Sequence, residues 1–208
     1  MKGTVRVISG FLKGRVIPFH ISKSHNADIT PQKVKGALFS LLGERLTGKT
    51  FIDLYSGSGQ IGIEALSRDC GLVIFNEKDK RRLDLIRDFL TLVYNGDSVI
   101  LLNLNASTAL KYLSCKGICA DIIYLDPPYQ KEKGQNNFYI SVLEQVSLSG
   151  ILNEASQVIV QHFTPNELPV SCNNLLKKEV KKYGATSLSI YSVDAVTGTL
   201  ERQESPGT

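Results

Sequence analysis

The fold of this 208-residue chain is decided by residues 51–59, FIDLYSGSG. The apolar start of this stretch predicts a short buried strand, and the glycines that follow predict a tight turn. Residues 60–68 continue as a predicted helix with one apolar side. The pattern G-x-G-x-x-G is completed within this segment by Gly57, Gly59 and Gly62.

Two acidic residues near the turn bear on which ligand it binds. The glycine pattern alone is typical of turns that bind a dinucleotide pyrophosphate. Asp53 immediately precedes the turn, where its carboxylate would repel a pyrophosphate and attract the positively charged amino group of S-adenosylmethionine. Glu77 lies 20 residues beyond Gly57, at the end of the predicted strand 72–76, and provides the acid that either ligand needs for its ribose hydroxyls. We therefore favour S-adenosylmethionine, with a nicotinamide or flavin dinucleotide as the alternative.

A second motif, Asp126-Pro127-Pro128-Tyr129, follows the apolar run of residues 122–125. An exocyclic amino nitrogen of a planar base is a poor nucleophile because its lone pair is delocalised into the ring. The Asp126 carboxylate and the Pro127 carbonyl can accept its two N–H groups and turn the lone pair outward. The two prolines fix the direction of that carbonyl, and Tyr129 offers a flat face for the base. The alternative is an ordinary turn that ends a strand.

The acid in this motif favours guanine as the target base. Guanine presents its ring N1–H beside its amino group, so a carboxylate, which only accepts hydrogen bonds, matches that edge. Adenine and cytosine present a ring acceptor beside the amino group, which suits an Asn side chain better. Adenine stays open as an alternative, because Asp also occurs in similar motifs of adenine-specific DNA enzymes.

Predicted strands and helices alternate from Thr50 onward. They comprise residues 51–54, 60–68, 72–76, 79–93, 98–102, 106–114, 121–125, 136–147 and 157–161, followed by a closing hairpin of residues 180–183 and 187–191. This order predicts a parallel sheet that is covered on both faces and binds its ligand at the carboxyl ends of its strands. Asn105 follows one such strand, where it is expected to contact the donor adenine, to cap the next helix, or to do both.

The first 50 residues are strongly basic. Their formal charge is +7, within a total of +4 for the chain. Residues 5–9 and 15–17 predict a hairpin around the loop 10–14, and residues 20–30 read as a linker. Phe11 is expected either to stack on an unpaired base of a nucleic acid beside Lys13 and Arg15 or to pack into a local core. Thr30 and Pro31 predict the start of a helix, with Thr30 as the N-cap and residues 34, 38, 41 and 42 on its apolar side.

Composition narrows the functional classes. The chain lacks an apolar run long enough to span a membrane, and its start lacks a signal peptide. Its four cysteines show neither a disulfide pattern nor a set of metal ligands, so reduced thiols in the cytoplasm are expected. We expect no metal and a monomeric protein.

Along nearly its whole length the chain resembles the bacterial 16S ribosomal RNA (guanine-N2)-methyltransferases of the RsmD type. The resemblance rests on residues 6–10, 13–15, 30–42, 53–68, 76–79, 126–129 and 182–184. The N-terminal hairpin followed by the helix at Thr30 is its most specific part. The chain departs from the family at Asp28-Ile29, where Arg-Pro is usual, at Gly36, where an acid is usual, and at Asn105, where Asp is usual.

The resemblance implies a Rossmann-like α/β fold with a seven-stranded S-adenosylmethionine-dependent methyltransferase sheet and a small N-terminal β-hairpin. It implies an RNA-contacting segment 1–30, a methyltransferase domain 31–195 and a polar tail 196–208. The substrate is then 16S rRNA, within the small ribosomal subunit. The alternatives are an adenine-N6 methyltransferase acting on RNA or DNA and a non-catalytic RNA-binding module.

The expected site residues fall into three groups. The catalytic group is Asp126, Pro127, Pro128 and Tyr129. The donor is expected to contact Thr30, Asp53, Tyr55, Gly57, Gly59, Glu77, Lys78, Asn105, Ala106 and Asp126. RNA is expected to contact Arg6, Phe11, Lys13 and Arg15.

Overall fold

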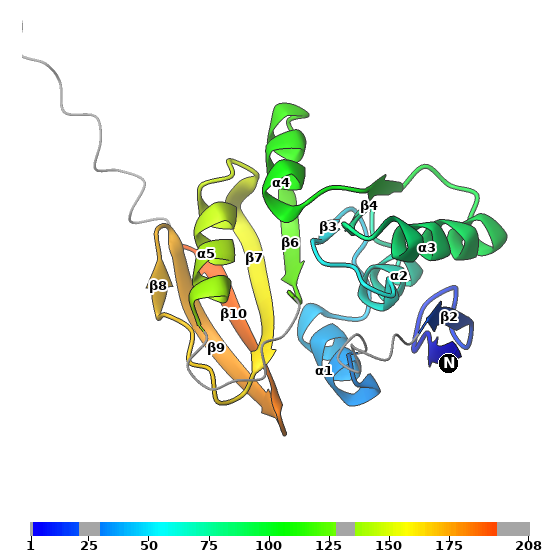
Figure 1. The fold of residues 1–208 in the computed structure, drawn as a ribbon, viewed down its shortest axis with the longest axis horizontal. Coiled ribbons are helices and arrows are strands. Elements are labelled where there is room, and N and C mark those ends of the chain that lie inside the picture. Colours follow the sequence, from blue (N-terminus) through cyan, green and yellow to red (C-terminus); the bar gives the residue numbers. More distant parts are fainter. Residues whose placement is uncertain (1, 21–29, 128–135, 195–208) are drawn as a thin grey trace, which may run out of the picture.

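Strands and helices alternate through most of the chain (Figure 1), as the sequence predicts. The computed structural model describes residues 2–20, 30–127 and 136–194. The strands are β1 (Lys2–Arg6), β2 (Val16–His20), β3 (Thr50–Asp53), β4 (Leu72–Asn76), β5 (Val99–Leu102), β6 (Ala120–Leu125), β7 (Leu152–Phe163), β8 (Ser171–Cys172), β9 (Leu175–Tyr183) and β10 (Thr186–Val193). The helices are α1 (Gln32–Leu42), α2 (Gln60–Ser67), α3 (Lys80–Val93), α4 (Ala106–Cys115) and α5 (Asn137–Ser147).

The main sheet has eight strands in the order β5-β4-β3-β6-β7-β10-β9-β8. The predicted Rossmann-like α/β sheet is confirmed, and the two-residue strand β8 adds one strand to the seven expected. β3 to β7 pair in parallel, whereas β10 runs antiparallel to both β7 and β9. The parallel part predicted from the alternating elements and the closing hairpin predicted after it are therefore both present. β9 and β10 are joined by only two residues, and so short a connection permits only antiparallel pairing.

Two hydrophobic clusters lie on the two faces of the sheet. One joins α1, α2 and α3 to the hairpin, through residues such as Leu38, Ile61 and Ile86. The other joins α4 and α5 to the opposite face, through residues such as Leu110 and Leu143. Figure 1 shows these two groups of helices on different sides of the central strands. Burial on both faces explains why the central strands β3, β4 and β6 read as continuous apolar runs.

The start of α1 differs from the sequence prediction. Pro31 occupies the N-cap position and no side chain caps the helix, so Thr30 is not its N-cap. Of the predicted apolar positions, Val34 and Leu38 are buried and Leu42 packs partly against the core, but Leu41 is exposed. Phe39 and Lys35 are buried in addition. The apolar side of α1 is therefore rotated from the predicted one, because the helix packs against α2 as well as the sheet.

The hairpin strands pair with Lys2 opposite His20 and Arg6 opposite Val16. They lie farther from the tip than predicted, which leaves residues 7–15 as the tip loop. Val7, Leu12 and Ile17 of the hairpin are buried in the same cluster as α1, α2 and α3. The hairpin therefore shares its core with the sheet domain.

The connection pattern places a crevice between β3 and β6. From β3 the chain moves outward through β4 to β5 and then crosses back to β6 on the other side of β3. Ligands of such sheets bind at this switch point, outside the carboxyl ends of the strands. Among the described residues, no helix is long and apolar enough to cross a membrane.

Candidate active site

A cavity of about 690 Å³ opens at the carboxyl ends of the central strands. The loops after β3, β4, β5 and β6 all contribute to its wall. Residues expected at the donor site line it, namely Thr30, Asp53, Tyr55, Gly57, Glu77, Lys78, Asn105, Ala106 and Asp126, together with Pro127 from the catalytic motif. Pro128 and Tyr129 lie outside the described residues.

Asp53 ends β3 and is 1% exposed. Its Oδ2 accepts a hydrogen bond from the Gly62 N–H at 3.0 Å. Its Oδ1 is buried and has no hydrogen-bond partner among the described residues. Burial raises the pKa of this carboxyl to about 8, and the nearby carboxylates of Asp126 and Glu77 also raise it, while the Gly62 bond opposes the rise. A cation entering the cavity would therefore stabilise the ionised form of Asp53.

The glycine turn is held in shape by Glu77. The Glu77 Oε2 accepts from the Gly57 N–H at 2.9 Å, and its Oε1 accepts from the Asp79 N–H at 2.8 Å. Each carboxylate oxygen can accept a second hydrogen bond, so the contact to a ribose hydroxyl remains chemically possible and stays a prediction.

Gly59 shapes the turn and does not line the cavity. Its φ of 75° is left-handed, and a Cβ there would lie 2.8 Å from the Ile86 side chain. At Gly62 a Cβ would lie 2.3 Å from the Phe75 ring, so this glycine lets α2 pack closely against β4.

Thr30 links α1 to the catalytic motif. Its Oγ1 donates to the Asp126 Oδ2 at 3.3 Å. With the Gln60 amide oriented to satisfy both groups, its nitrogen donates to the Thr30 carbonyl at 3.2 Å and its oxygen accepts from the Thr30 N–H at 2.7 Å. The first residue of α2 thus positions Thr30, which in turn contacts Asp126.

Asn105 caps α4, which confirms one of the two roles expected for it. Its Oδ1 accepts from the Thr108 N–H at 2.9 Å and from the Ser107 hydroxyl at 3.1 Å. It also lines the cavity together with Ala106. The adenine contact stays a prediction.

Some residues of the cavity wall escaped the sequence analysis. They include Gln60 of α2, Arg82 of α3, and Phe138, Val142 and Gln145 of α5. Gln60 directly follows the glycine turn, which is the one sequence signal that could have found it. The α5 residues reach the cavity only because α5 packs beside α4, and nothing in their own sequence indicates that neighbour.

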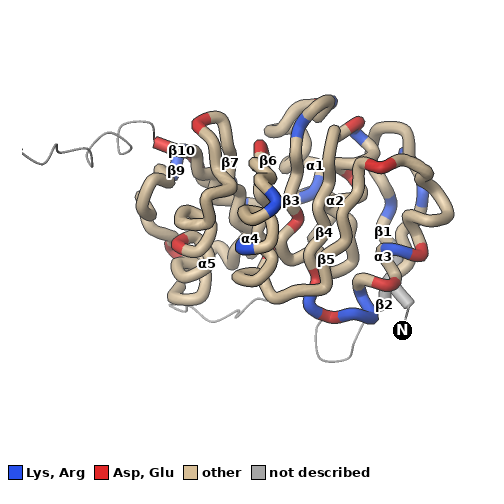
Figure 2. Tube along the Cα trace, turned by 90° about the horizontal axis from the view of Figure 1, so that it is seen from above, with Lys and Arg blue, Asp and Glu red and all other residues tan. Residues whose placement is uncertain are grey.

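The residues expected to contact RNA lie on the hairpin. Phe11 is 58% exposed, and Lys13, Arg15 and Arg6 are exposed, with the Arg6 guanidinium donating to the Gly14 carbonyl at 2.8 Å. Figure 2 shows Lys and Arg positions around β1, β2 and α3. The exposed Phe11 excludes the alternative in which its ring packs into a local core.

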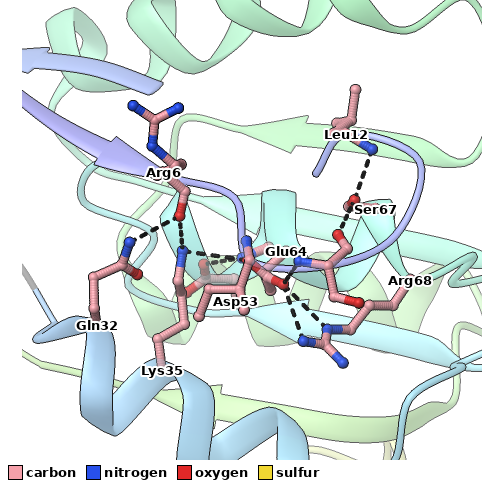
Figure 3. A network of polar contacts seen from close by, with 11 residues as sticks. Arg6, Leu12, Gln32, Lys35, Asp53, Glu64, Ser67 and Arg68 are labelled. Carbon is pink, nitrogen blue, oxygen red and sulfur yellow. Dashed lines mark hydrogen bonds and ion pairs between the residues drawn. The ribbon is translucent and has the colours of Figure 1, made fainter. Parts of the chain in front are cut away.

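Lys35 cannot belong to this basic surface, although it contributes to the charge of the first 50 residues. It is 0% exposed, and its Nζ lies 3.3 Å from Glu64 Oε2 and donates to the Arg6 carbonyl at 2.8 Å. Burial lowers its pKa, and the Glu64 carboxylate opposes that change. Figure 3 shows this network, in which Glu64 also contacts Arg68 at 3.1 Å. The network joins the hairpin, α1 and α2.

Comparisons with known proteins show the family of the chain. The family described as Conserved hypothetical protein 95 matches residues 5–192. A Bacillus subtilis protein named putative rRNA methyltransferase YlbH is 31% identical over 90% of this chain and 98% of its own length. The Escherichia coli protein named ribosomal RNA small subunit methyltransferase D is 28% identical over 93% of this chain and 92% of its own length.

The fold is also that of a solved Escherichia coli protein described as the putative methyltransferase yhhF. The two have a TM-score of 0.75 and 24% identity, with 93% of this chain and 99% of that chain covered. The family match and the two named relatives confirm the resemblance to the RsmD type over nearly the whole chain. Because the match spans most of the chain, with the glycine turn and the Asp-Pro-Pro-Tyr motif inside it, the chain belongs to the Conserved hypothetical protein 95 family.

Proposed function

We propose that this protein transfers a methyl group from S-adenosylmethionine to the exocyclic N2 of a guanine in 16S ribosomal RNA. The observation that carries the proposal is that Asp53 and Asp126 line one cavity at the carboxyl edge of the sheet. One acid is suited to the donor and the other to the acceptor base. The names of the relatives support the RNA substrate.

The cavity fits S-adenosylmethionine because it contains a buried acid and is lined by residues suited to a ribose and an adenine. The buried Asp53 Oδ1 lacks a hydrogen-bond partner among the described residues, and a carboxylate in that state suits the donor's ammonium group. Glu77 would accept from the ribose hydroxyls, while Asn105 and Ala106 would border the adenine. When bound, S-adenosylmethionine supplies a methyl group on a positively charged sulfur.

The reaction is driven mainly by how the chain positions the target nitrogen. The Asp126 carboxylate and the Pro127 carbonyl would accept the two N–H groups of the amine, so that its lone pair points away from them. Thr30 holds Asp126 Oδ2 at 3.3 Å and thereby limits its rotation. The methylated nitrogen is strongly acidic and sheds its proton without a strong base. The guanine must leave its stack to enter the cavity.

Asp126→Ala tests this mechanism. We expect methyl transfer to fall by about 10²-fold or more, since the variant loses an electrostatic contact made to the reacting group. Donor affinity, measured by calorimetry, should change far less. A near-normal rate of transfer in this variant would contradict the mechanism.

Nucleoside mass spectrometry identifies the substrate. Small subunits, naked 16S rRNA and DNA would each be incubated with wild-type protein and S-adenosylmethionine, then digested. N2-methylguanosine from the RNA supports the proposal, whereas N6-methyladenosine identifies the adenine alternative. Donor binding without any product would favour a non-catalytic RNA-binding module.

A further inference from the structure

The tip loop of the hairpin holds an exposed aromatic ring on a fixed backbone. The Phe11 N–H donates to the Ser67 carbonyl at 2.9 Å, and the Leu12 N–H donates to the Ser67 hydroxyl at 2.9 Å. Leu12 is buried at 3% exposure, while the neighbouring Phe11 is 58% exposed. The loop is therefore anchored to α2 while it points Phe11 outward.

Gly10 makes this anchoring possible. Its φ is +80°, and a Cβ at this position would lie 1.6 Å from the Ser67 carbonyl oxygen. Only glycine allows the loop to approach the end of α2 so closely. A loop whose backbone is already anchored loses little conformational entropy on binding, which favours a preorganised contact.

A second aromatic residue lies beside Phe11. The ring centroids of Phe11 and Tyr94 are 6.2 Å apart, and the ring planes are tilted by 32°. Tyr94 follows the last turn of α3 and accepts a hydrogen bond from the Ser98 N–H at 3.2 Å through its hydroxyl. The two rings form an aromatic pair that joins the hairpin to α3.

The pair lies at the sheet edge opposite the cavity. Gln60, the first residue of α2, lines the cavity, whereas Ser67, the last residue, anchors the tip loop. The two ends of this helix are about 10 Å apart along its axis. Any ligand on the aromatic pair is therefore outside the donor cavity.

The charges of the hairpin that carries Phe11 favour a polyanion. Residues 2–20 contain Lys2, Arg6, Lys13 and Arg15 and no Asp or Glu. Lys13 and Arg15 are exposed within the same tip loop as Phe11. A ligand with flat apolar faces and regularly spaced negative charges matches this combination, and single-stranded nucleic acid has both. Paired bases are shielded within a duplex, so phosphate contacts alone would leave the exposed ring without a role.

We propose that an unpaired nucleotide of the RNA stacks on the Phe11–Tyr94 pair while its neighbouring phosphates contact Lys13 and Arg15. This deepens the proposed function and rests on it for the identity of the RNA. The stacked nucleotide differs from the target guanine, because the two subsites lie at opposite ends of α2. The pair anchors the RNA and takes no part in the chemistry.

Substitution of Phe11 gives the kinetic test. Phe11→Ala should raise the KM for RNA about 5- to 100-fold, the range expected for loss of one stacked base, and leave donor affinity unchanged. Phe11→Tyr should retain most of the affinity, since it keeps the ring. Leu148→Ala is the control, because Leu148 is also strongly exposed and follows α5, on the far side of the molecule from the hairpin in Figure 1. An unchanged KM in Phe11→Ala overturns the proposal.

Fluorescence reports the stacking directly. The chain contains no tryptophan, so Phe11→Trp creates a single tryptophan at the pair, whose emission can be excited selectively over that of the eight tyrosines. A single-stranded oligoadenylate and naked 16S rRNA should quench it, while the same oligoadenylate in a duplex should quench it much less. Leu148→Trp should respond to none of them. Equal responses of the two fluorophores to single strands overturn the proposal.

These two tests separate failure of this inference from failure of the proposed function. Quenching of Phe11→Trp by single strands supports the aromatic subsite even if the wild-type protein methylates no RNA. Normal methylation by wild type, combined with no effect of Phe11→Ala, overturns the subsite alone. Phe11→Ala could also raise the KM for small subunits but not for naked 16S rRNA. That result would mean that Phe11 contacts a ribosomal protein, and it would overturn the RNA contact.

Discussion

Two buried carboxylates on neighbouring segments have opposite surroundings. Glu64, in the middle of α2, is 0% exposed and accepts from the Ile8 N–H at 2.8 Å and the Ser9 N–H at 2.9 Å, besides its contacts with Lys35 and Arg68. Asp53 is 1% exposed, and only one of its oxygens has a partner among the described residues. Figure 3 shows Glu64 at the centre of its network.

The difference separates a carboxylate that is compensated within the protein from one that is suited to binding a cation. Cations and backbone N–H groups from three elements surround Glu64, so its charge is compensated within the protein. Asp53 has two acidic neighbours in place of cations, and its pKa is raised to about 8. An oxygen left without a partner is costly in the absence of ligand and becomes favourable once a cation binds. The cavity therefore carries a local cost in stability that the Glu64 network does not.

The largest expected effect is on the Glu64 network. Glu64→Ala leaves Lys35 and Arg68 buried without their anion and two hairpin N–H groups without their acceptor. We expect the free energy of unfolding to fall by about 3–5 kcal/mol. Urea denaturation measures it, and hydrogen exchange should rise at residues 8 and 9. Replacement of the exposed Glu154 by Ala is the control, with a change within about 0.5 kcal/mol. Equal losses in the two variants would show that the network adds no stability.

Asp53→Asn should have the opposite effect on stability and a smaller one. The amide retains an acceptor for the Gly62 N–H and removes a buried charge. At pH 9 we expect the ligand-free variant to be more stable than wild type by about 1–3 kcal/mol, and S-adenosylmethionine to bind about 10- to 100-fold more weakly. Urea denaturation and calorimetry measure the two quantities. Unchanged donor affinity in this variant would show that Asp53 does not bind the donor.

The pH dependence sharpens the same contrast. The folded-state pKa of Asp53, about 8, exceeds its unfolded value, so this group's contribution to stability is full below pH 4 and is lost as the pH rises towards 8. The stability advantage of Asp53→Asn should therefore shrink from pH 9 to pH 5. Repetition of the urea titrations across this range checks it. An advantage that is constant with pH would mean that Asp53 is already ionised at pH 5.

Proton release on donor binding is the smallest expected effect, and it reports the ionisation of Asp53 most directly. Near pH 7 Asp53 is mostly protonated, so binding of the cationic donor should release a proton from it. Calorimetry in buffers of different ionisation enthalpy counts the protons released. Asp53→Asn should release up to one proton fewer than wild type at this pH. If both proteins released the same number of protons, the released proton would come from a group other than Asp53.

Much of the site was predictable from the sequence because it follows from local order. Asp53, Glu77 and Asp126 end or directly follow an apolar run, Asn105 comes three residues after one, and parallel strands bring such positions to one edge. Thr30 was also expected there, although its role differs. It contacts Asp126 through its hydroxyl and does not cap α1.

Other parts could not be predicted because they depend on packing between distant segments. Nothing in the sequence around Lys35 indicates that it is buried. Its partner Glu64 lies 29 residues later in the chain. Phe138 reaches the cavity from α5, whose position against α4 has no signature in either sequence segment. The short turn before β10 predicted that β10 forms a hairpin with β9. It gave no sign that β10 also pairs with β7.

The sequence by itself determined the alternating order of strands and helices, the glycine turn and the identity of the acids at the strand ends. These depend on local periodicity and backbone conformation, which neighbouring residues specify. Only the tertiary structure decided that Glu64 is neutralised while Asp53 is not, and that the hairpin tip faces away from the cavity. The reason is that the environment of a charge depends on which groups surround it in space, and those groups come from segments far apart in the chain.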